Sequence, residues 1–308
     1  MTMAIVTHPS CRLHDMGDDH PEQPARLGAI HDALLASGLD FTVRHVDAPT
    51  VTREQLLRVH DPEYLDLIET VSPTTGLKPL DDDTLMNPHS LEAARHAAGA
   101  VIKAVDLVMN DDIDKVFCNV RPPGHHAGHD HAGGFCIYNN VAAGAAYALD
   151  AYGLERIAIV DFDVHHGNGT QDIFEGDPRV LFCSSFQHPY YPFSGDEATA
   201  DNVINIPLPA GTGGEDFRRA VEARWLAPLD AFRPQLVMLS AGFDAHAADP
   251  MAQFRLREAD FAWITDQARE LALRHADGRV VSVLEGGYDL PALGRSVAAH
   301  LDSLLGFK

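Results

Sequence analysis

Four short segments of the chain combine histidine, aspartate and tyrosine with glycine or proline, a mixture typical of catalytic and metal-binding loops. Carboxylates and imidazoles hold metal ions, and imidazoles also exchange protons near neutral pH. Eighteen of the 308 residues are histidine, and they do not form a terminal tag. The four segments are RPPGHHAGHDHAGGF (121–135), DFDVHHGNGT (161–170), AGFDAHAADP (241–250) and GGYDL (286–290).

The second segment predicts a metal site. Asp161, Asp163 and His165 alternate along a stretch expected to be extended, so their side chains share one face. Asp163 and His165 then offer an oxygen and a nitrogen to one metal, and Asp244 is the natural third ligand. Such a set suits Zn²⁺, with Fe²⁺ and Co²⁺ as competitors, and leaves a position open for water. The alternative for D-x-H alone is a hydrogen-bonded strand end, which the other three segments disfavour.

Adjacent His125 and His126, on a turn bounded by Gly and Pro, are candidates for a general base. Asp161 and Asn168 are available to hold the two rings and fix their tautomers. A carboxylate partner raises the pKa of a histidine and an amide leaves it lower, so the two need not titrate alike. Taken alone, the pair could also be two solvated turn histidines.

Tyr288 follows two glycines in E-G-G-Y, where the backbone can adopt conformations closed to other residues. A phenol held there could donate a hydrogen bond to the oxyanion that forms when a metal-bound carbonyl is attacked. Phe135, after Gly133 and Gly134, could similarly form an aromatic wall. The acidic run at 81–83 is usually solvated, with a role for one member at a substrate rim as the alternative.

The rest of the pattern predicts the elements that position these groups. Short runs that are apolar throughout alternate with helical stretches, which favours a parallel sheet covered by helices on both faces. Ligands of such sheets bind beyond the carboxyl ends of the strands, where the four segments fall. The expected strands are 115–120, 156–164, 179–184, 235–240 and 279–285; the expected helices are 90–109, 139–153, 215–229 and 257–276; the longest expected loop is 186–202.

Composition narrows the function further. Lys plus Arg number 23 and Asp plus Glu 45, a net charge of −22, which argues against binding of nucleic acids or anionic membranes. The four cysteines lie far apart without a C-x-x-C pair, and no apolar stretch is long enough to span a bilayer. We therefore expect a cytoplasmic protein with a single domain over 1–308 and cationic partners. Assembly into a homo-oligomer stays open.

The four motifs, in this order, resemble the zinc-dependent histone deacetylase and acetylpolyamine amidohydrolase family. The similarity runs from HPEQPARL near the start to the last expected helix, and Asn168 and LEGGY are closest to class II members. The resemblance implies an arginase/deacetylase fold, a single three-layer α/β domain with about eight mostly parallel strands between helices. It also implies hydrolysis of an N-acetyl amide by a compact, bacterial-type enzyme.

Particular roles follow from the resemblance for the residues of the site. In the catalytic centre it implies Asp163, His165 and Asp244 as zinc ligands, His126 as general base with His125 as its partner, Tyr288 beside the acetyl carbonyl, and Asp161 and Asn168 behind the two histidines. Around the substrate it implies Phe135 and Tyr191 as tunnel walls, Gly134 as acceptor of the amide N–H, Gly286 and Gly287 as substrate contacts, Asp83 as the rim aspartate and Arg26 as part of an inner acetate channel.

The resemblance also implies two structural monovalent cations. The inner one, K⁺, would be held by Asp161 with the hydroxyl of Ser184 and the carbonyls of Asp163, His165 and Ser185. An outer one would use backbone carbonyls near Phe174, Asp177 and Val180.

The substrate stays open between acetyl-lysine in proteins or peptides, which we favour, and acetylpolyamines or other small acylated amines. A non-catalytic acyl-lysine binding protein is less favoured because Tyr288, His125 and His126 are all present. A ureohydrolase on the same fold would need two metals and an additional metal-binding Asp near Asp244.

Overall fold

Eight strands form one parallel sheet, in the order β2–β1–β5–β10–β9–β6–β7–β8, in the computed structural model of this chain. The structure describes residues 2–110, 113–197 and 199–306. A two-stranded antiparallel pair, β3 and β4, lies outside this sheet. The strands are β1 (Met3–Thr7), β2 (Arg44–Asp47), β3 (Lys78–Pro79), β4 (Leu85–Met86), β5 (Lys115–Cys118), β6 (Ile157–Asp161), β7 (Val180–Gln187), β8 (Val203–Leu208), β9 (Leu236–Ala241) and β10 (Val280–Leu284).

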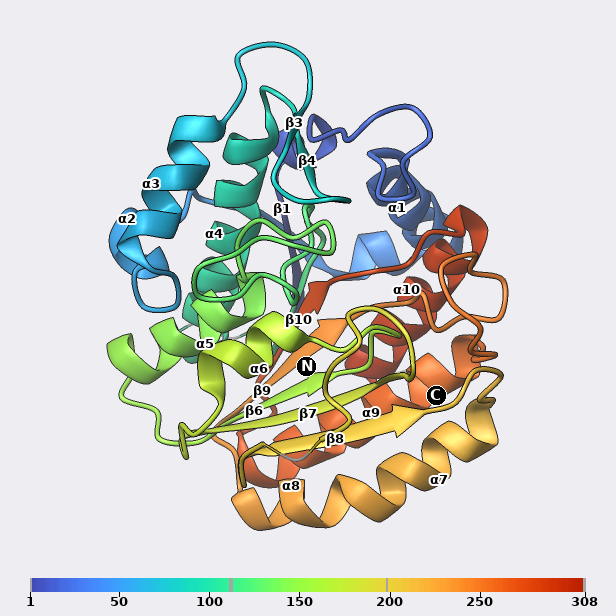
Figure 1. The fold of residues 1–308 in the computed structure, drawn as a ribbon. Coiled ribbons are helices and arrows are strands. Elements are labelled where there is room, and N and C mark those ends of the chain that lie inside the picture. The colour runs from blue at the N-terminus through green and yellow to red at the C-terminus, as the bar shows by residue number, and fades with distance from the viewer. Residues whose placement is uncertain (1, 111–112, 198, 307–308) are drawn as a thin grey trace.

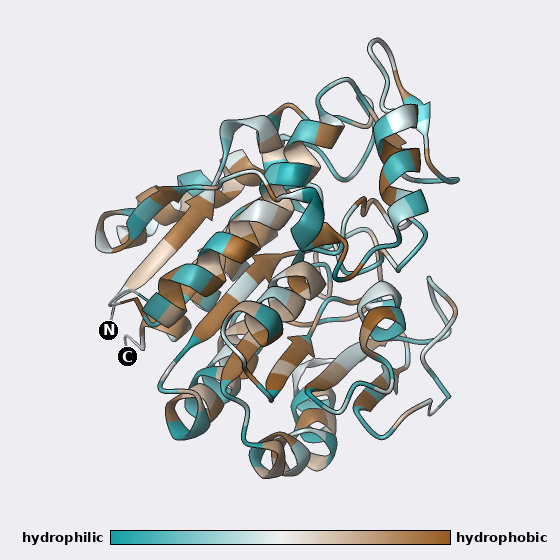
Figure 2. Cartoon of the chain, turned by 90° about the vertical axis from the view of Figure 1, so that its left-hand side faces the viewer, coloured by the Kyte–Doolittle hydropathy of each residue, from teal (hydrophilic) through white to brown (hydrophobic). Residues whose placement is uncertain are grey.

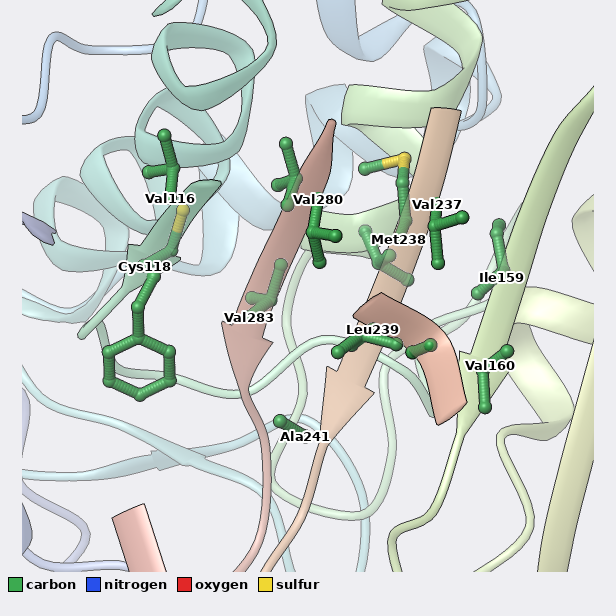
Figure 3. Close-up of a cluster of buried hydrophobic side chains, with 14 of the residues drawn as sticks. Val116, Cys118, Ile159, Val160, Val237, Met238, Leu239, Ala241, Val280 and Val283 are labelled. Atoms are coloured by element: carbon green, nitrogen blue, oxygen red, sulfur yellow. The ribbon is translucent and has the colours of Figure 1, made fainter. Parts of the chain in front are cut away.

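The central strands consist almost entirely of apolar residues because both of their faces are covered. Every residue of β5, β6, β9 and β10 is buried, and the side chains of these strands fill the core on both sides of the sheet (Figure 3). Burial of branched side chains on two faces explains why these runs do not alternate between polar and apolar residues. The hydrophobic effect therefore stabilises these four central strands, and the site is formed by the residues that follow them.

Helices cover both faces (Figure 1). One layer contains α4 and α5, which pack on the central strands, and α6, which packs on β7; the other contains α1, α7, α8, α9 and α10. Their apolar sides face the sheet and their polar sides face outward (Figure 2). Within the described residues, no helix is long and apolar enough to cross a membrane. The helices are α1 (Ala25–Ser37), α2 (Arg53–Leu56), α3 (Pro62–Val71), α4 (Ser90–Asn110), α5 (Asn140–Ala151), α6 (Asn168–Phe174), α7 (Gly214–Arg224), α8 (Leu226–Phe232), α9 (Glu258–His275) and α10 (Leu290–Leu305), with 3₁₀ turns at Pro9–Arg12 and Leu39–Thr42.

The predicted fold class, a three-layer α/β domain with about eight parallel strands, is confirmed. Three details differ from the expected elements. The helix expected at 215–229 is broken at Trp225 into α7 and α8, because the ring of Pro228 is incompatible with the carbonyl four residues earlier in a continuous helix. β6 ends at Asp161, so Asp163 and His165 lie in the bends that follow it. β7 continues to Gln187, which shortens the long loop at its beginning.

The four segments singled out above follow β5, β6, β9 and β10, which are adjacent in the sheet. In a parallel sheet, the carboxyl ends of neighbouring strands lie at the same edge. The topology therefore brings residues that are more than 160 positions apart in the sequence to one place.

Candidate active site

Two carboxylates and one imidazole converge beyond the ends of β6 and β9. The ligand atoms of Asp163, His165 and Asp244 lie within 4.8 Å of one another, the only such group among the described residues. His165 Nδ1 lies 3.1 Å from Asp163 Oδ1 and 3.1 Å from Asp244 Oδ2. All three side chains are buried. Buried carboxylates need a compensating charge, and two oxygens with one nitrogen suit a divalent cation.

The electrostatics of this group also fit a cation. Burial raises the pKa of Asp244 to about 7, and the charge of Asp163 adds to the rise. Burial alone would lower the pKa of His165, but its hydrogen bonds to the two aspartates outweigh that effect and raise the pKa to about 10. A divalent cation among the three would favour charged carboxylates and a neutral imidazole, the forms that bind metals.

His125 and His126 lie beside this group, with ring centres 4.0 Å apart. His125 Nδ1 lies 2.9 Å from Asp161 Oδ2, and His126 Nδ1 lies 2.7 Å from Asn168 Oδ1, so each ring meets the partner expected for it. Burial lowers the pKa of His125, but the charges of Asp161 and Asp163 outweigh burial and raise it well above its usual value. The pKa of His126 is lowered well below its usual value by burial and by the neighbouring His125.

The two pKa shifts have opposite directions, so the charged form is favoured for His125 and the neutral form for His126. With Nδ1–H donating to the Asn168 oxygen, Nε2 of His126 is the basic nitrogen. The pair therefore combines a ring that favours a positive charge with one that can accept a proton.

Glu285, the last residue before the two glycines, was missed by the sequence analysis although it lies within LEGGY. Its Oε2 accepts hydrogen bonds from the backbone N–H groups of Gly124 (2.7 Å) and His125 (3.2 Å), and its Oε1 lies 3.3 Å from Ser240 Oγ. Burial raises the pKa of Glu285 to about 7. This carboxyl group ties the histidine turn after β5 to β9 and β10.

Tyr288 reaches the site from the loop after β10. Its backbone N–H donates to Asp249 Oδ2 (2.7 Å), and the Arg26 guanidinium lies 5.0 Å from the centre of its ring. Arg26 Nε also donates to the Gly287 carbonyl (2.7 Å). Burial raises the pKa of the phenol well above its usual value, and the charge of Asp244 adds to the rise. The phenol therefore keeps its proton and is a hydrogen-bond donor.

Two glycines, one in this loop and one in the segment after β5, leave no room for a side chain. A Cβ on Gly286 would lie 2.2 Å from Asp244 Oδ2, while its N–H donates to Asp163 Oδ2 at 2.8 Å. Gly134 has a φ of 53°, and a Cβ there would lie 2.3 Å from His126 Cδ2. The backbone at both positions thus approaches the metal-binding group or the histidine pair more closely than any other residue would allow.

Arg26 belongs to a buried charged cluster that the sequence analysis did not recognise. Glu22 accepts hydrogen bonds from Arg26 Nη1 (2.8 Å) and Arg121 Nη2 (2.5 Å), and its Oε2 lies 3.5 Å from His14 Nε2. Burial opposes ionisation of Glu22, but the two guanidinium groups outweigh it and hold its pKa well below the usual range. Arg26 thereby fixes the loop that carries Tyr288. Its role in an acetate channel stays a prediction.

A pocket of about 230 Å³ leads to the metal-binding group. Phe135, Tyr191 and Asp83, expected around the substrate, all line it; Tyr190, Phe193 and Met251 line it as well and were not expected. Tyr190, Tyr191 and Phe193 belong to the long loop after β7. The role of this loop was open in the sequence; in the structure it forms one wall of the pocket. The lining residues are Asp83, His126, Gly134, Phe135, His165, Tyr190, Tyr191, Phe193, Met251 and Tyr288.

The acidic run at 81–83 is folded into the pocket rim rather than simply solvated. Asp81 Oδ1 accepts hydrogen bonds from the backbone of Asp83 (3.1 Å) and Thr84 (2.6 Å), and Thr84 Oγ1 accepts one from Phe135 N (3.0 Å). Burial raises the pKa of Asp83, and the charge of Asp81 adds to the rise. A carboxylate thus lies directly beside the aromatic wall.

The residues expected to hold monovalent cations lie along β6, α6 and β7. Asp161 on β6 pairs in register with Ser184 on β7, and Ser184 Oγ lies 3.0 Å from His166 Nδ1. Ser185 is buried next to it. Binding of an inner cation by Asp161, Ser184 and Ser185 stays a prediction. At the outer position, the carbonyls of the predicted residues meet a side chain that was not anticipated, described below.

Residues 20–304 match the histone deacetylase domain. The chain belongs to the histone deacetylase family. It is 38% identical over 295 residues to the histone deacetylase-like amidohydrolase of Pseudomonas aeruginosa, covering 92% of this chain and 77% of that protein. It is 37% identical over 329 residues to the human polyamine deacetylase HDAC10, covering 99% of this chain and 48% of that protein. The crystal structure of the HDA15 HD domain matches with a TM-score of 0.92 at 34% identity, covering 99% of this chain and 90% of that one.

This result confirms the family expected from the four motifs and makes the chain an amide-hydrolysing enzyme of the deacetylase type. Histone deacetylase family members typically depend on a metal, and the buried group of Asp163, His165 and Asp244 could bind one.

Proposed function

We propose that this chain is a zinc-dependent deacetylase that removes acetyl groups from lysine side chains in proteins or peptides. The observation that carries the proposal is the pocket of about 230 Å³, with walls of aromatic rings and Met251, that reaches His126, His165 and Tyr288. A lysine side chain is an apolar stem, and its acetyl group would end where the polar residues converge. Oxygen and nitrogen ligands open on one side suit a catalytic zinc ion.

The ion, held by Asp163, His165 and Asp244, would supply Lewis acidity toward the acetyl carbonyl and the attacking water. His126 Nε2 takes a proton from that water and later returns it to the leaving amine. Cationic His125 stabilises negative charge on the reacting carbonyl. These roles agree with the opposite pKa shifts of the two histidines.

Substrate contacts follow from the pocket walls. Phe135 and Tyr191 enclose the apolar stem, and the Gly134 carbonyl accepts the amide N–H of the acetyl-lysine. Asp83 at the rim accepts backbone N–H groups of a peptide, and Gly286 and Gly287 bring the backbone close to the acetyl group. The Tyr288 phenol donates to the carbonyl oxygen as it becomes negative. K⁺ is proposed at the inner position, held by Asp161, Ser184 and Ser185.

Acetylpolyamines are the second candidate substrate. The rim carboxylate of Asp83, the net charge of −22 and the similarity to a polyamine deacetylase favour it. The apolar wall at Met251 disfavours it, because a polyamine carries a further ammonium group that needs a partner when it is desolvated. A non-catalytic acyl-lysine binding protein is disfavoured by the presence of both a base and a phenol donor.

The deciding experiment compares kcat/KM of the zinc-loaded protein on an acetyl-lysine peptide and on N-acetylated polyamines. We expect the peptide to be preferred. A strong preference for polyamines would replace the proposal by its alternative. Zinc binding without hydrolysis of any acyl amide would contradict an enzymatic role altogether.

Met251→Glu is expected to shift this preference toward acetylpolyamines. The variant places a carboxylate on the apolar wall of the pocket, where it can pair with an ammonium group but not with a lysine stem. A charge pair in such a partly buried place contributes about 1–2 kcal/mol, a change of about 10-fold in the ratio of kcat/KM values. Met251→Gln, polar but uncharged, is the control. An equal change in the ratio of kcat/KM values for Met251→Gln and Met251→Glu would show that the charge of the carboxylate plays no part.

Asn168→Asp is expected to move the acidic limb of the pH profile to higher pH by raising the pKa of His126. In the wild type this pKa lies well below its usual value, so His126 is already neutral at pH 7 and activity is lost only as pH falls through that low pKa. A carboxylate 2.7 Å from Nδ1 would raise the pKa by about 1–3 units, which moves the acidic limb of kcat/KM upward by the same amount. Position 168 begins α6, where a negative charge is favourable, so the variant should fold. An unchanged pH profile would argue against His126 as the base.

A further inference from the structure

Three backbone carbonyls converge on one side-chain nitrogen where α6 leads into β7, beside the start of β8 (Figure 1). Asn202 Nδ2 lies 2.8 Å from the carbonyl oxygen of Phe174, 3.1 Å from that of Asp177 and 3.0 Å from that of Val180. These are the same three carbonyls that the family resemblance implies for an outer monovalent cation.

The orientation of the amide is fixed by its other end. Asn202 Oδ1 accepts a hydrogen bond from Gly176 N (2.9 Å), so the nitrogen, not the oxygen, faces the carbonyls. An amide nitrogen carries two hydrogens, yet three carbonyl oxygens surround this one. Several carbonyls directed at one point are the arrangement with which proteins replace the hydration shell of a monovalent cation.

We infer that the Asn202 amide takes the place of the outer monovalent cation, so that this chain binds no cation at Phe174, Asp177 and Val180. A cation in contact with the three oxygens would overlap Nδ2, which lies within 3.1 Å of each of them. The residues at this position therefore do not fit the second cation, although the carbonyls are in place. The inference concerns a structural position and does not depend on the proposed hydrolysis.

The three carbonyls are therefore bound by the neutral amide of Asn202, which is part of the chain, and not by an ion from solution. A bound cation stabilises a fold only in proportion to its occupancy, which depends on its concentration. The Asn202 amide is present at every salt concentration. The connection between α6, β7 and β8 should therefore gain no stability from K⁺ at this outer position.

Anomalous diffraction from crystals grown in Rb⁺, an analogue of K⁺, tests the inference directly. We expect the wild type to show no peak within bonding distance of the three carbonyls and Asn202→Ala to show one there. A peak at this position in the wild type would overturn the inference. Absence of the peak from the variant as well would show that the carbonyls are not a cation site that the amide has filled, which would also overturn it.

A second measurement in solution uses Tm as a function of K⁺, with ionic strength held constant by choline. Asn202→Ala is expected to be destabilised without K⁺ and to regain about 2 °C for each tenfold rise in K⁺ above the dissociation constant, beyond any rise seen in the wild type. Asn205→Ala is the matched control, because Asn205 Nδ2 bonds instead to Gln171 Oε1 (2.8 Å) and the Gly195 carbonyl (2.9 Å). Equal K⁺ responses of the two variants would contradict the inference.

Should Asn202→Ala fail to fold, the isosteric Asn202→Asp takes its place in both measurements. It keeps the shape but replaces the donor by an oxygen among three carbonyl oxygens, a repulsion that a cation would remove. We expect Asn202→Asp to depend more steeply on K⁺ than the wild type. A Tm of Asn202→Asp that does not change with K⁺ concentration would overturn the inference, whatever Asn202→Ala shows.

Discussion

Tyr288→Phe is expected to lower kcat by about 10²–10³-fold, the usual effect of removing one donor to a developing oxyanion. The phenol is buried beside the metal-binding group and keeps its proton, because burial raises its pKa well above the usual value. Phenylalanine preserves the ring, which packs 5.9 Å from Phe135 and 5.0 Å from the Arg26 guanidinium. Folding, metal content and KM should therefore change little, so that the loss appears in kcat.

Tyr190→Phe provides the matched control for this prediction. Tyr190 lines the same pocket, but its hydroxyl donates to the Met251 carbonyl (2.8 Å) rather than facing the metal-binding group. Loss of that hydroxyl should cost about 1 kcal/mol of local stability and leave kcat within a fewfold of the wild type. Equal kcat for Tyr288→Phe and the wild type would exclude a transition-state role for the phenol.

Asp163→Asn is expected to abolish metal binding and, with it, turnover. Among the described residues only Asp163, His165 and Asp244 form such a group, and the replacement removes the charge of one of them. Changes in residues behind the ligands already cost about 10–100-fold in metal affinity, so loss of a ligand should cost more. The zinc content measured after dialysis should fall from about one ion per chain toward zero, and activity should fall in proportion.

Asp249→Asn is the control for Asp163→Asn. It shows whether zinc is lost because a ligand is removed or merely because a buried negative charge is removed. Asp249 is also buried near the site, but its Oδ2 accepts hydrogen bonds from Tyr288 N (2.7 Å) and Asp289 N (3.2 Å), and it is not part of the metal-binding group. An asparagine oxygen can still accept these two bonds, although the third, from Met251 N to Oδ1 (2.9 Å), is lost. Asp249→Asn should keep the metal, and full zinc content in Asp163→Asn would contradict the proposed ligand set.

The sequence predicted the edge of the sheet at which the site forms, because the chemistry is concentrated in segments that directly follow apolar strands. His125 and His126 meet the partners expected for them at 2.9 and 2.7 Å for that reason. The metal-binding group is also assembled from the expected residues. Their catalytic roles stay predictions until variants are measured.

Other features could not be predicted, for different physical reasons. β2 and β8 are edge strands of the sheet with mostly exposed or half-buried residues, so their apolar pattern is weak. Glu285 acts through its carboxylate on backbone N–H groups 160 residues away, a contact that only the topology creates. The Asn202 side chain enters the predicted cation position through loop geometry, which residue types do not encode.

The position of β10 has a consequence for how the protein matures. This strand, the last in the sequence, lies between β5 and β9 in the middle of the sheet. Without it the other strands would form two separate groups, β2–β1–β5 and β9–β6–β7–β8, each with an unpaired edge at β5 or β9. Glu285 and Tyr288 arrive with this strand and the loop after it, so the site is completed only as the two halves join. Closure of the sheet and assembly of the site are thus one and the same event.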